Sequence, residues 1–215
     1  CGMTIRVLLA DDHTLIREGL RALLTSAPGI SVIGEVHTGR EAVSAVQQLD
    51  PDVIVMDIAM PDLNGIEAAR LIHAKSPEIR IVMLSMHSTD EHVYRALEAG
   101  ASGYLLKEAA GEEVITAVRV VHAGRRYLCT ALAGSVRGSA PFAHAPGPVD
   151  SLSPREQQVL QMVVEGKTSS EIARILCLSP KSVETYRNRL MRKLGVENIP
   201  SLVKFALELG LTPPK

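Results

Sequence analysis

The chain has 215 residues, of which 46% are hydrophobic and 22% are charged, and this composition argues against an intrinsically disordered chain or a collagen-like fibre. The net charge of -1 hides an asymmetry, because residues 1–133 carry 12 basic against 17 acidic residues and residues 151–215 carry 10 against 6. An acidic part suits a metal cation or solubility, whereas a basic part suits a polyanion, so we expect two domains with different partners.

No apolar run reaches the roughly 18 residues that a membrane-spanning helix needs, and no basic leader with an apolar stretch opens the chain. The three cysteines, Cys1, Cys129 and Cys177, include no Cys-x-x-Cys pair, so their spacing predicts neither a disulfide framework nor a zinc site. We therefore expect a cytoplasmic protein without a membrane partner.

Short apolar runs alternate with amphipathic segments over the first part of the chain. The apolar runs predict five strands, at residues 5–10, 31–36, 53–56, 81–85 and 103–106. The intervening segments have helical periodicity, and three of them begin with a cap pair: Thr38 with Glu41, Asn64 with Glu67, and Ser88 with Glu91. The alternation predicts a doubly wound α/β domain with a five-stranded parallel sheet over residues 1–133, and leaves the strand order open.

Residues 134–150 mix glycine and proline with alanine and serine and have no hydrophobic periodicity. This composition predicts an interdomain linker. The alternative is a long surface loop within one domain, which is disfavoured because structureless connections of this length are uncommon in compact folds.

Residues 151–215 have helical periodicity only. Their start and stop signals predict four helices, which run from Ser153-Pro154 to Gly166, from Thr168 to about Leu176, from Ser179-Pro180 to Gly195, and from about Pro200 to Leu209. The second and third of these are separated by a tight connection, which is typical of a helix-turn-helix motif. We therefore expect a second, smaller all-α domain.

Polar residues follow the predicted strands of the first domain. Asp11 and Asp12 follow the first strand, Asp57 the third, Ser85 ends the fourth and Lys107 follows the fifth. Because the carboxyl ends of parallel strands meet at one edge, these groups are expected to converge. Crowded carboxylates take up a proton or bind a cation, of which Mg²⁺ is the natural choice. Such a site suits phosphoryl transfer to a carboxylate, with the Lys107 ammonium stabilising the developing charge.

Four segments carry a resemblance to a known family: Leu9-Ala10-Asp11-Asp12-His13, residues 56–65 from Met56 to Gly65, Leu84-Ser85, and Tyr104-Leu105-Leu106-Lys107. Together they resemble the receiver domain of two-component response regulators, over residues 4 to about 125. The resemblance implies a flavodoxin-like fold with Asp57 as the phosphoacceptor. It also implies Mg²⁺ ligation by Asp12, Asp57 and the backbone carbonyl of Ala59, with Asp11 acting through a water on the metal.

The same resemblance implies roles for three further residues. Lys107 would contact the phosphoryl oxygens, the Ser85 hydroxyl would turn toward them, and Tyr104 would change rotamer as a switch. The sequence departs from many receivers at Glu108, where proline is common, and this leaves the geometry of the Lys107–Glu108 peptide open. We interpret His13 as an exposed loop histidine rather than a metal ligand, and a half-buried Tyr104 without a signalling role is the alternative to the switch.

The third predicted helix of the second domain is strongly basic. Its apolar stripe consists of Val183, Tyr186, Leu190 and Leu194, and the other face is polar. A basic polar face on a helix-turn-helix, in a part of the chain (residues 151–215) with a net charge of +4, indicates DNA binding rather than a face that is only solvated. The segments 152–156, 171–173, 182–186 and 192–196 resemble the LuxR-type domain, and the whole chain resembles a NarL/FixJ-type response regulator.

That resemblance implies base contacts and phosphate contacts from one helix. The base contacts would come from Glu184, Thr185 and Asn188, and the phosphate contacts from Lys181, Arg187, Arg189 and Arg192. Glu184 and Tyr186 depart from residues common in the family, so the DNA target cannot be transferred from relatives. A glutamate here would accept a hydrogen bond from a cytosine amino group within its reach.

We therefore predict a DNA-binding response regulator, whose phosphorylation on Asp57 by a sensor histidine kinase controls homodimerisation and transcription. A phosphatase or phosphotransferase with an aspartyl nucleophile is the first alternative. It is disfavoured because Ala59 occupies the position two residues after the nucleophile, where such hydrolases often need a second acid, so we expect no enzyme. A regulator that works without phosphorylation is the second alternative, and the intact acidic pocket argues against it.

Overall fold

The structure, a computed structural model, describes residues 4–86, 90–133 and 151–208. These residues form two compact units, which divide between residues 142 and 143 and which we call the first and the second unit. The predicted linker at 134–150 lies outside the described residues, so the exact domain bounds stay a prediction. None of the helices in the described ranges is long and apolar enough to cross a membrane.

The first unit is built on one parallel sheet. Its elements are β1 (Ile5–Ala10), α1 (Thr14–Ser26), β2 (Ile30–Val36), α2 (Gly39–Leu49), β3 (Val53–Asp57), α3 (Gly65–Lys75), β4 (Arg80–Ser85), α4 (Asp90–Glu98), β5 (Gly103–Leu106), α5 (Ala110–His122), β6 (Tyr127–Leu128) and α6 (Thr130–Ala133). All neighbouring strands pair in parallel, in the order β2-β1-β3-β4-β5-β6. The doubly wound α/β prediction and its five strands are confirmed, and β6 is a short sixth strand that the sequence pattern did not predict.

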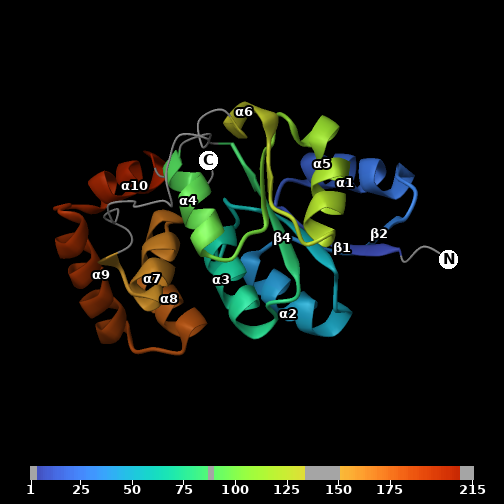
Figure 1. Cartoon of the computed structure of the whole chain (residues 1–215). Coiled ribbons are helices and arrows are strands. Elements are labelled where there is room, and N and C mark those ends of the chain that lie inside the picture. Colours follow the sequence, from blue (N-terminus) through green and yellow to red (C-terminus); the bar gives the residue numbers. More distant parts are fainter. Residues whose placement is uncertain (1–3, 87–89, 134–150, 209–215) are drawn as a thin grey trace. The chain divides into compact units, whose positions relative to one another are not determined.

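Helices cover both faces of this sheet (Figure 1). Helices α1 and α5 pack together over one face, while α2, α3 and α4 form a row over the other. All five residues of β3 are buried, because a central strand between two helical layers has no solvent-facing side. Because these strands run parallel, the carboxyl ends of β1, β3, β4 and β5 share one edge of the sheet.

Helix caps fix where the helices of the first unit begin. The side chains of Thr38 and Asn64 accept hydrogen bonds from the backbone amides of Glu41 and Glu67, at 3.1 and 2.9 Å, as their spacing predicts. The third predicted pair includes Ser88, which lies outside the described residues. These caps satisfy amides that a helix start otherwise leaves without partners.

The second unit is wholly helical, as predicted. Its helices are α7 (Pro154–Val164), α8 (Ser169–Leu176), α9 (Pro180–Leu194) and α10 (Ile199–Glu208). Capping boxes begin α7 at Ser153 and α8 at Thr168, and Gly195 ends α9 in the left-handed conformation, with φ of 66°. Helices α7, α8 and α9 pack on one another around a separate hydrophobic core, and α10 packs on α7. This arrangement confirms the predicted four-helix domain with a helix-turn-helix pair.

Candidate functional site

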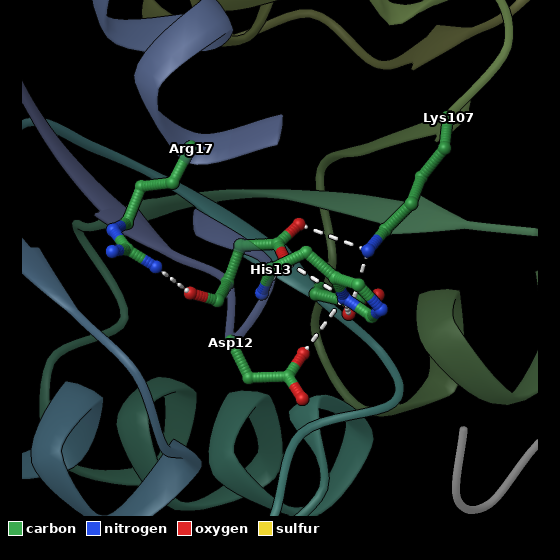
Figure 2. A network of polar contacts seen from close by, with 6 residues as sticks. Asp12, His13, Arg17 and Lys107 are labelled. Atoms are coloured by element: carbon green, nitrogen blue, oxygen red, sulfur yellow. Dashed lines mark hydrogen bonds and ion pairs between the residues drawn. The ribbon is translucent and has the colours of Figure 1, made fainter. Parts of the chain in front are cut away.

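Three charged side chains from distant parts of the sequence meet at the carboxyl edge of the sheet (Figure 2). Asp57 ends β3, Asp11 directly follows β1, and Lys107 directly follows β5. The Lys107 Nζ lies 2.8 Å from Oδ2 of Asp57 and 2.9 Å from Oδ2 of Asp11. All three side chains are at most 5% exposed, so this is a buried ion cluster rather than a surface pairing.

Asp12 and His13 lie at the more open side of the same cluster. The His13 Nδ1 is 2.9 Å from Oδ1 of Asp12, 3.3 Å from Oδ1 of Asp11 and 4.0 Å from Oδ2 of Asp57. The backbone amide of His13 also donates to Asp11 Oδ1 at 2.8 Å. The His13 side chain is 48% exposed, as expected of a loop residue, but it also faces all three carboxylates, which the sequence interpretation did not foresee.

Arg17 in α1 supports the cluster from behind and was missed by sequence reasoning. Its guanidinium donates to the backbone carbonyl of Asp11 at 2.7 Å (Figure 2). It also donates to the Glu35 carboxylate at 3.1 Å. Arg17 is 6% exposed, and its two partners lie on different strand ends. The contact depends on how α1 packs on β1 and β2, so no local sequence signal could have indicated it.

Gly65 allows α3 to begin close against the Asp57 strand end. A Cβ at this position would lie 2.0 Å from the Asp57 carbonyl oxygen, far inside any van der Waals contact. The Gly65 amide instead donates to the Ile58 carbonyl at 2.8 Å, which closes the loop that contains Ala59. Glycine at this position therefore sets the position of the strand end that presents Asp57.

Burial and charge act against each other on the ionisable groups of the cluster. Burial raises the pKa of Asp57 to about 6, with the Lys107 ammonium lowering it and the nearby Asp11 raising it further. Burial lowers the pKa of Lys107, but its ion pairs with Asp57 and Asp11 outweigh this, so the net pKa is raised and the ammonium stays charged. The cluster thus holds one fixed positive charge against the carboxylates.

Ser85 and Tyr104 lie on the neighbouring strands β4 and β5. Both are buried, with Tyr104 fully inaccessible, and the two side chains share a hydrogen bond. Burial raises the pKa of Tyr104 to about 12, with the Ser85 bond acting in the opposite direction. Tyr104 is therefore more deeply buried than the half-buried alternative supposed. All described peptide bonds are trans, including the one between Lys107 and Glu108.

The donor set of the cluster fits a divalent cation. Ligand atoms of Asp11, Asp12, His13 and Asp57 lie within 4.8 Å of one another. Oδ2 of Asp11 and Oδ1 of Asp12 are buried and accept no hydrogen bond from the described residues, although each has an ion-pair neighbour at 2.9 Å. Such oxygen atoms are the ligands that hard cations prefer, so the pocket is compatible with a metal ion.

The second unit exposes the polar face of α9. Exposed side chains include Lys181, Glu184, Thr185, Asn188, Arg189 and Arg192. Val183 and Leu190 of the predicted stripe are buried in the core, and Tyr186 and Leu194 pack against it. The division of α9 into an apolar and a polar face follows the sequence prediction.

Two basic residues of α9 have partners within the second unit. The Lys193 Nζ contacts the buried Glu156 carboxylate at 2.7 Å and the Ser151 carbonyl at 2.9 Å, which ties the end of α9 to the start of α7. Arg187, predicted as a phosphate contact, is only partly exposed and contacts Glu184 and Ser169. Helical periodicity in the sequence does not predict these contacts.

Comparison with known proteins assigns both units to described families. Residues 7–119 match the response regulator receiver domain, and residues 150–206 match the bacterial regulatory proteins of the luxR family. The chain is a luxR-family response regulator. This confirms the predicted family and class of function.

Full-length relatives share this arrangement of domains. The response regulator UvrY of Escherichia coli is 38% identical over 215 residues, which cover 96% of this chain and 95% of that protein. The structure of RcsB from Salmonella typhimurium, a response regulator studied for its interaction with DNA, has a TM-score of 0.59 at 26% identity, with 95% and 98% of the two chains covered. A LuxR-family two-component response regulator from Aurantimonas has a TM-score of 0.60 at 36% identity, covering 62% of this chain and 96% of that chain. The chain is thus similar to UvrY and RcsB over both units.

Proposed function

We propose that this response regulator binds DNA and controls transcription, and that phosphorylation of Asp57 by a sensor histidine kinase switches it. The observation that carries the proposal is the buried Lys107 ammonium within 2.9 Å of both Asp57 and Asp11. A lysine and a group of acids in this geometry can hold the charges of a phosphoryl group at the Asp57 carboxylate.

In the proposed reaction a carboxylate oxygen of Asp57 attacks the phosphorus of the kinase phosphohistidine. The new O–P bond forms as the N–P bond breaks, and the histidine nitrogen leaves with the bonding electron pair. Lys107 would contact the phosphoryl oxygens with its ammonium. Ser85 and Tyr104 would respond through the hydrogen bond that they share, because the phosphoryl group adds charge and acceptor oxygens near Ser85.

We propose Mg²⁺ as the cation of this pocket. Asp11, Asp12, Asp57 and the carbonyl of Ala59 would hold it. Two buried carboxylate oxygens support this assignment, because within the described residues they have ion-pair neighbours only. When bound, Mg²⁺ would neutralise carboxylate charge and stabilise the negative charge that develops on the phosphoryl oxygens. His13 lies at the open side of the same carboxylates, with its Nδ1 2.9 Å from Oδ1 of Asp12.

We place DNA binding on the exposed face of α9. Glu184, Thr185 and Asn188 are proposed to contact bases, and Lys181, Arg187, Arg189 and Arg192 to contact phosphates, with a net charge of +4 on residues 151–215 attracting the polyanion. RcsB has been solved as two dimers bound to two parallel DNAs. A homodimer is proposed here also, because one small domain neutralises few phosphates and a second copy adds affinity through effective concentration. The cytoplasm, where DNA and kinase domains meet, is the proposed location.

Incubation with acetyl phosphate and Mg²⁺ tests the switch. We expect one stable adduct, visible as a shifted band on a phosphate-affinity gel, which Asp57→Asn removes. Asp50→Asn is the matched control, because Asp50 is an exposed aspartate whose side chain is 86% accessible. The Asp50 variant should be labelled like the wild type.

Three outcomes separate the proposal from its alternatives. A stable adduct at Asp57 supports the switch. Rapid multiple turnover of acetyl phosphate without an adduct would instead favour an aspartyl phosphatase. An absence of both labelling and turnover would favour a regulator that works without phosphorylation.

A further inference from the structure

A polar cluster joins the two helices of the helix-turn-helix pair. It consists of Ser169 at the start of α8 and of Glu184 and Arg187 on α9, and we call it the Ser169 cluster. The Ser169 hydroxyl donates to Oε1 of Glu184. The Arg187 Nη1 donates to the Ser169 oxygen at 2.8 Å and to the same Glu184 oxygen at 3.0 Å.

These three contacts close a ring. Ser169 uses its hydroxyl both as donor and as acceptor, and Oε1 of Glu184 accepts two hydrogen bonds. The other oxygen of Glu184, Oε2, accepts no hydrogen bond from the described part of the chain, and the Glu184 side chain is 52% exposed. The cluster therefore holds the carboxylate by one oxygen and leaves the other accessible.

Ser169 determines whether this carboxylate has a fixed orientation. Glu184 and Arg187 are three residues apart on one helix, and exposed ion pairs of this kind contribute little and leave both side chains mobile. A hydroxyl from α8 connects the pair to a second helix, whose start is fixed by the Thr168 and Glu171 capping box. Orientation relative to the whole motif thus depends on Ser169.

A glutamate near DNA also needs its charge compensated. An isolated carboxylate would be repelled by phosphates, whereas Arg187 supplies a neutralising guanidinium at 3.0 Å. A carboxylate held in this way can accept a hydrogen bond from the exocyclic amino group of cytosine, which is a donor in the major groove. Guanine presents only acceptors there, so the same oxygen discriminates against it.

We propose that Ser169 is a specificity-determining positioning residue, which together with Arg187 orients Glu184 toward a cytosine amino group. This inference rests on the proposed DNA-binding function and names the base that one residue recognises. It assigns Arg187 a part in sequence selection in addition to any phosphate contact. It also gives α8 a part in specificity, although Glu184 on α9 is the residue that would touch the base.

Selection of bound fragments from a random DNA pool, with the full-length protein treated with acetyl phosphate and Mg²⁺, tests the proposal. The wild type should select cytosine at one position of each half-site. Glu184→Gln should reduce the preference for cytosine at that position on the order of tenfold, because a glutamine amide can donate as well as accept and so no longer discriminates against guanine. Ser169→Ala should reduce the same preference by about threefold, an intermediate loss expected of residual orientation by Arg187.

Ser169→Thr and Ser170→Ala are the controls. Ser169→Thr keeps the hydroxyl, so its preference for cytosine should match that of the wild type rather than that of Ser169→Ala. If the serine only stabilised α8, base preference would not follow the presence of the hydroxyl. Ser170 is an exposed neighbour on the same helix, and its change to alanine should leave the preference unaltered. Affinity for non-specific DNA and its salt dependence should be the same for Ser169→Ala and wild type, since no phosphate contact is removed.

The outcomes separate this inference from the proposed function. The inference would be overturned if the wild type selects a sequence and Ser169→Ala shows the same preference for cytosine. It would also be overturned if Glu184→Gln leaves that preference unaltered. Either result would leave the proposed DNA binding intact. A uniform loss of affinity in Ser169→Ala without any change in base preference would also overturn the inference. If the wild type selects no sequence at all, the proposed function itself fails.

Discussion

The two units of this regulator place their charges in opposite ways. In the first unit Asp11, Asp57 and Lys107 are almost fully buried, and the Lys107 Nζ lies within 2.9 Å of both carboxylates. In the second unit the polar residues of α9 are mostly exposed along a single helix. The energy of a buried charge depends strongly on each of its partners, because no solvent screens it. Exposed charges are screened by water and salt, so their contributions to the energy are nearly additive. A single change should therefore have a large effect in the first unit and a graded one in the second.

The largest effect is expected where the backbone itself supports the buried cluster. Gly65→Ala would place a Cβ 2.0 Å from the Asp57 carbonyl oxygen, and backbone must shift to admit it. We expect a loss of about 3 kcal/mol in the free energy of unfolding, together with slower labelling by acetyl phosphate. Chemical denaturation measures the first effect.

Gly111→Ala provides the matched control for this variant. Gly111 lies near the start of α5, and a Cβ there meets no atom within 4 Å. The same substitution should stabilise the protein, by up to about 1 kcal/mol, because alanine favours a helix. If Gly65→Ala and Gly111→Ala have equal free energies of unfolding, α3 does not pack closely against the end of β3 at Gly65.

The pH dependence of stability should report the burial of Asp57. Its pKa is raised from 3.8 to about 6, so the folded protein binds the proton more tightly than the unfolded chain does. Because the pKa of Asp57 is higher in the folded protein, its protonation stabilises the fold fully at a pH below 3.8, the pKa in the unfolded chain. This stabilisation is lost as the pH rises through about 6, the pKa in the folded protein. Between pH 4.5 and 7.5 the loss from this group is about 2 kcal/mol, from the shift in pKa.

Asp57→Asn removes this titration. With EDTA present, the variant should gain about 2 kcal/mol relative to the wild type when the pH is raised from 4.5 to 7.5. Urea denaturation at both pH values measures the difference, and addition of Mg²⁺ at pH 7.5 should stabilise only the wild type. A difference between the two proteins that does not vary with pH would contradict the predicted burial of charge.

A smaller effect is expected from the exposed face of α9. Arg192→Ala should weaken DNA binding by about 1 kcal/mol for every sequence, and should lower the salt slope by about one for each bound copy. Lys193→Ala is the comparison, because Lys193 pairs with the buried Glu156 inside the second unit. It should lower stability with little change in salt slope, and identical slopes for both variants and wild type would show that Arg192 contacts no phosphate.

Local sequence patterns predicted much of the fold. The strands β1, β3, β4 and β5 are buried apolar runs with polar residues at their carboxyl ends, so periodicity placed them within one residue of their observed bounds. Strand β6 was missed because two residues, Tyr127 and Leu128, are too few to show a period. It exists because the backbone amide of Cys129 donates to the Tyr104 carbonyl, a contact across 25 positions of sequence.

The candidate site was predicted in part for the same reason. Topology alone brings Asp11, Asp57 and Lys107 together, since Asp57 ends one parallel strand and the other two residues directly follow such strands. The contacts of Arg17 with Asp11 and Glu35, and of Ser169 with Glu184, depend on how separate elements pack. Side-chain contacts between elements leave no regular spacing in the sequence, and so only the structure indicates them.

The central claim is that a phosphoryl group on Asp57 in the first unit controls DNA binding by the second. The affinity of the full-length protein for its selected DNA, measured at one salt concentration with and without acetyl phosphate and Mg²⁺, tests it most directly. We expect phosphorylation to raise the affinity of the wild type and of Asp50→Asn at least several-fold, and to leave the affinity of Asp57→Asn unchanged. Equal affinities of labelled and unlabelled wild-type protein, with the adduct verified on the same sample, would contradict the claim.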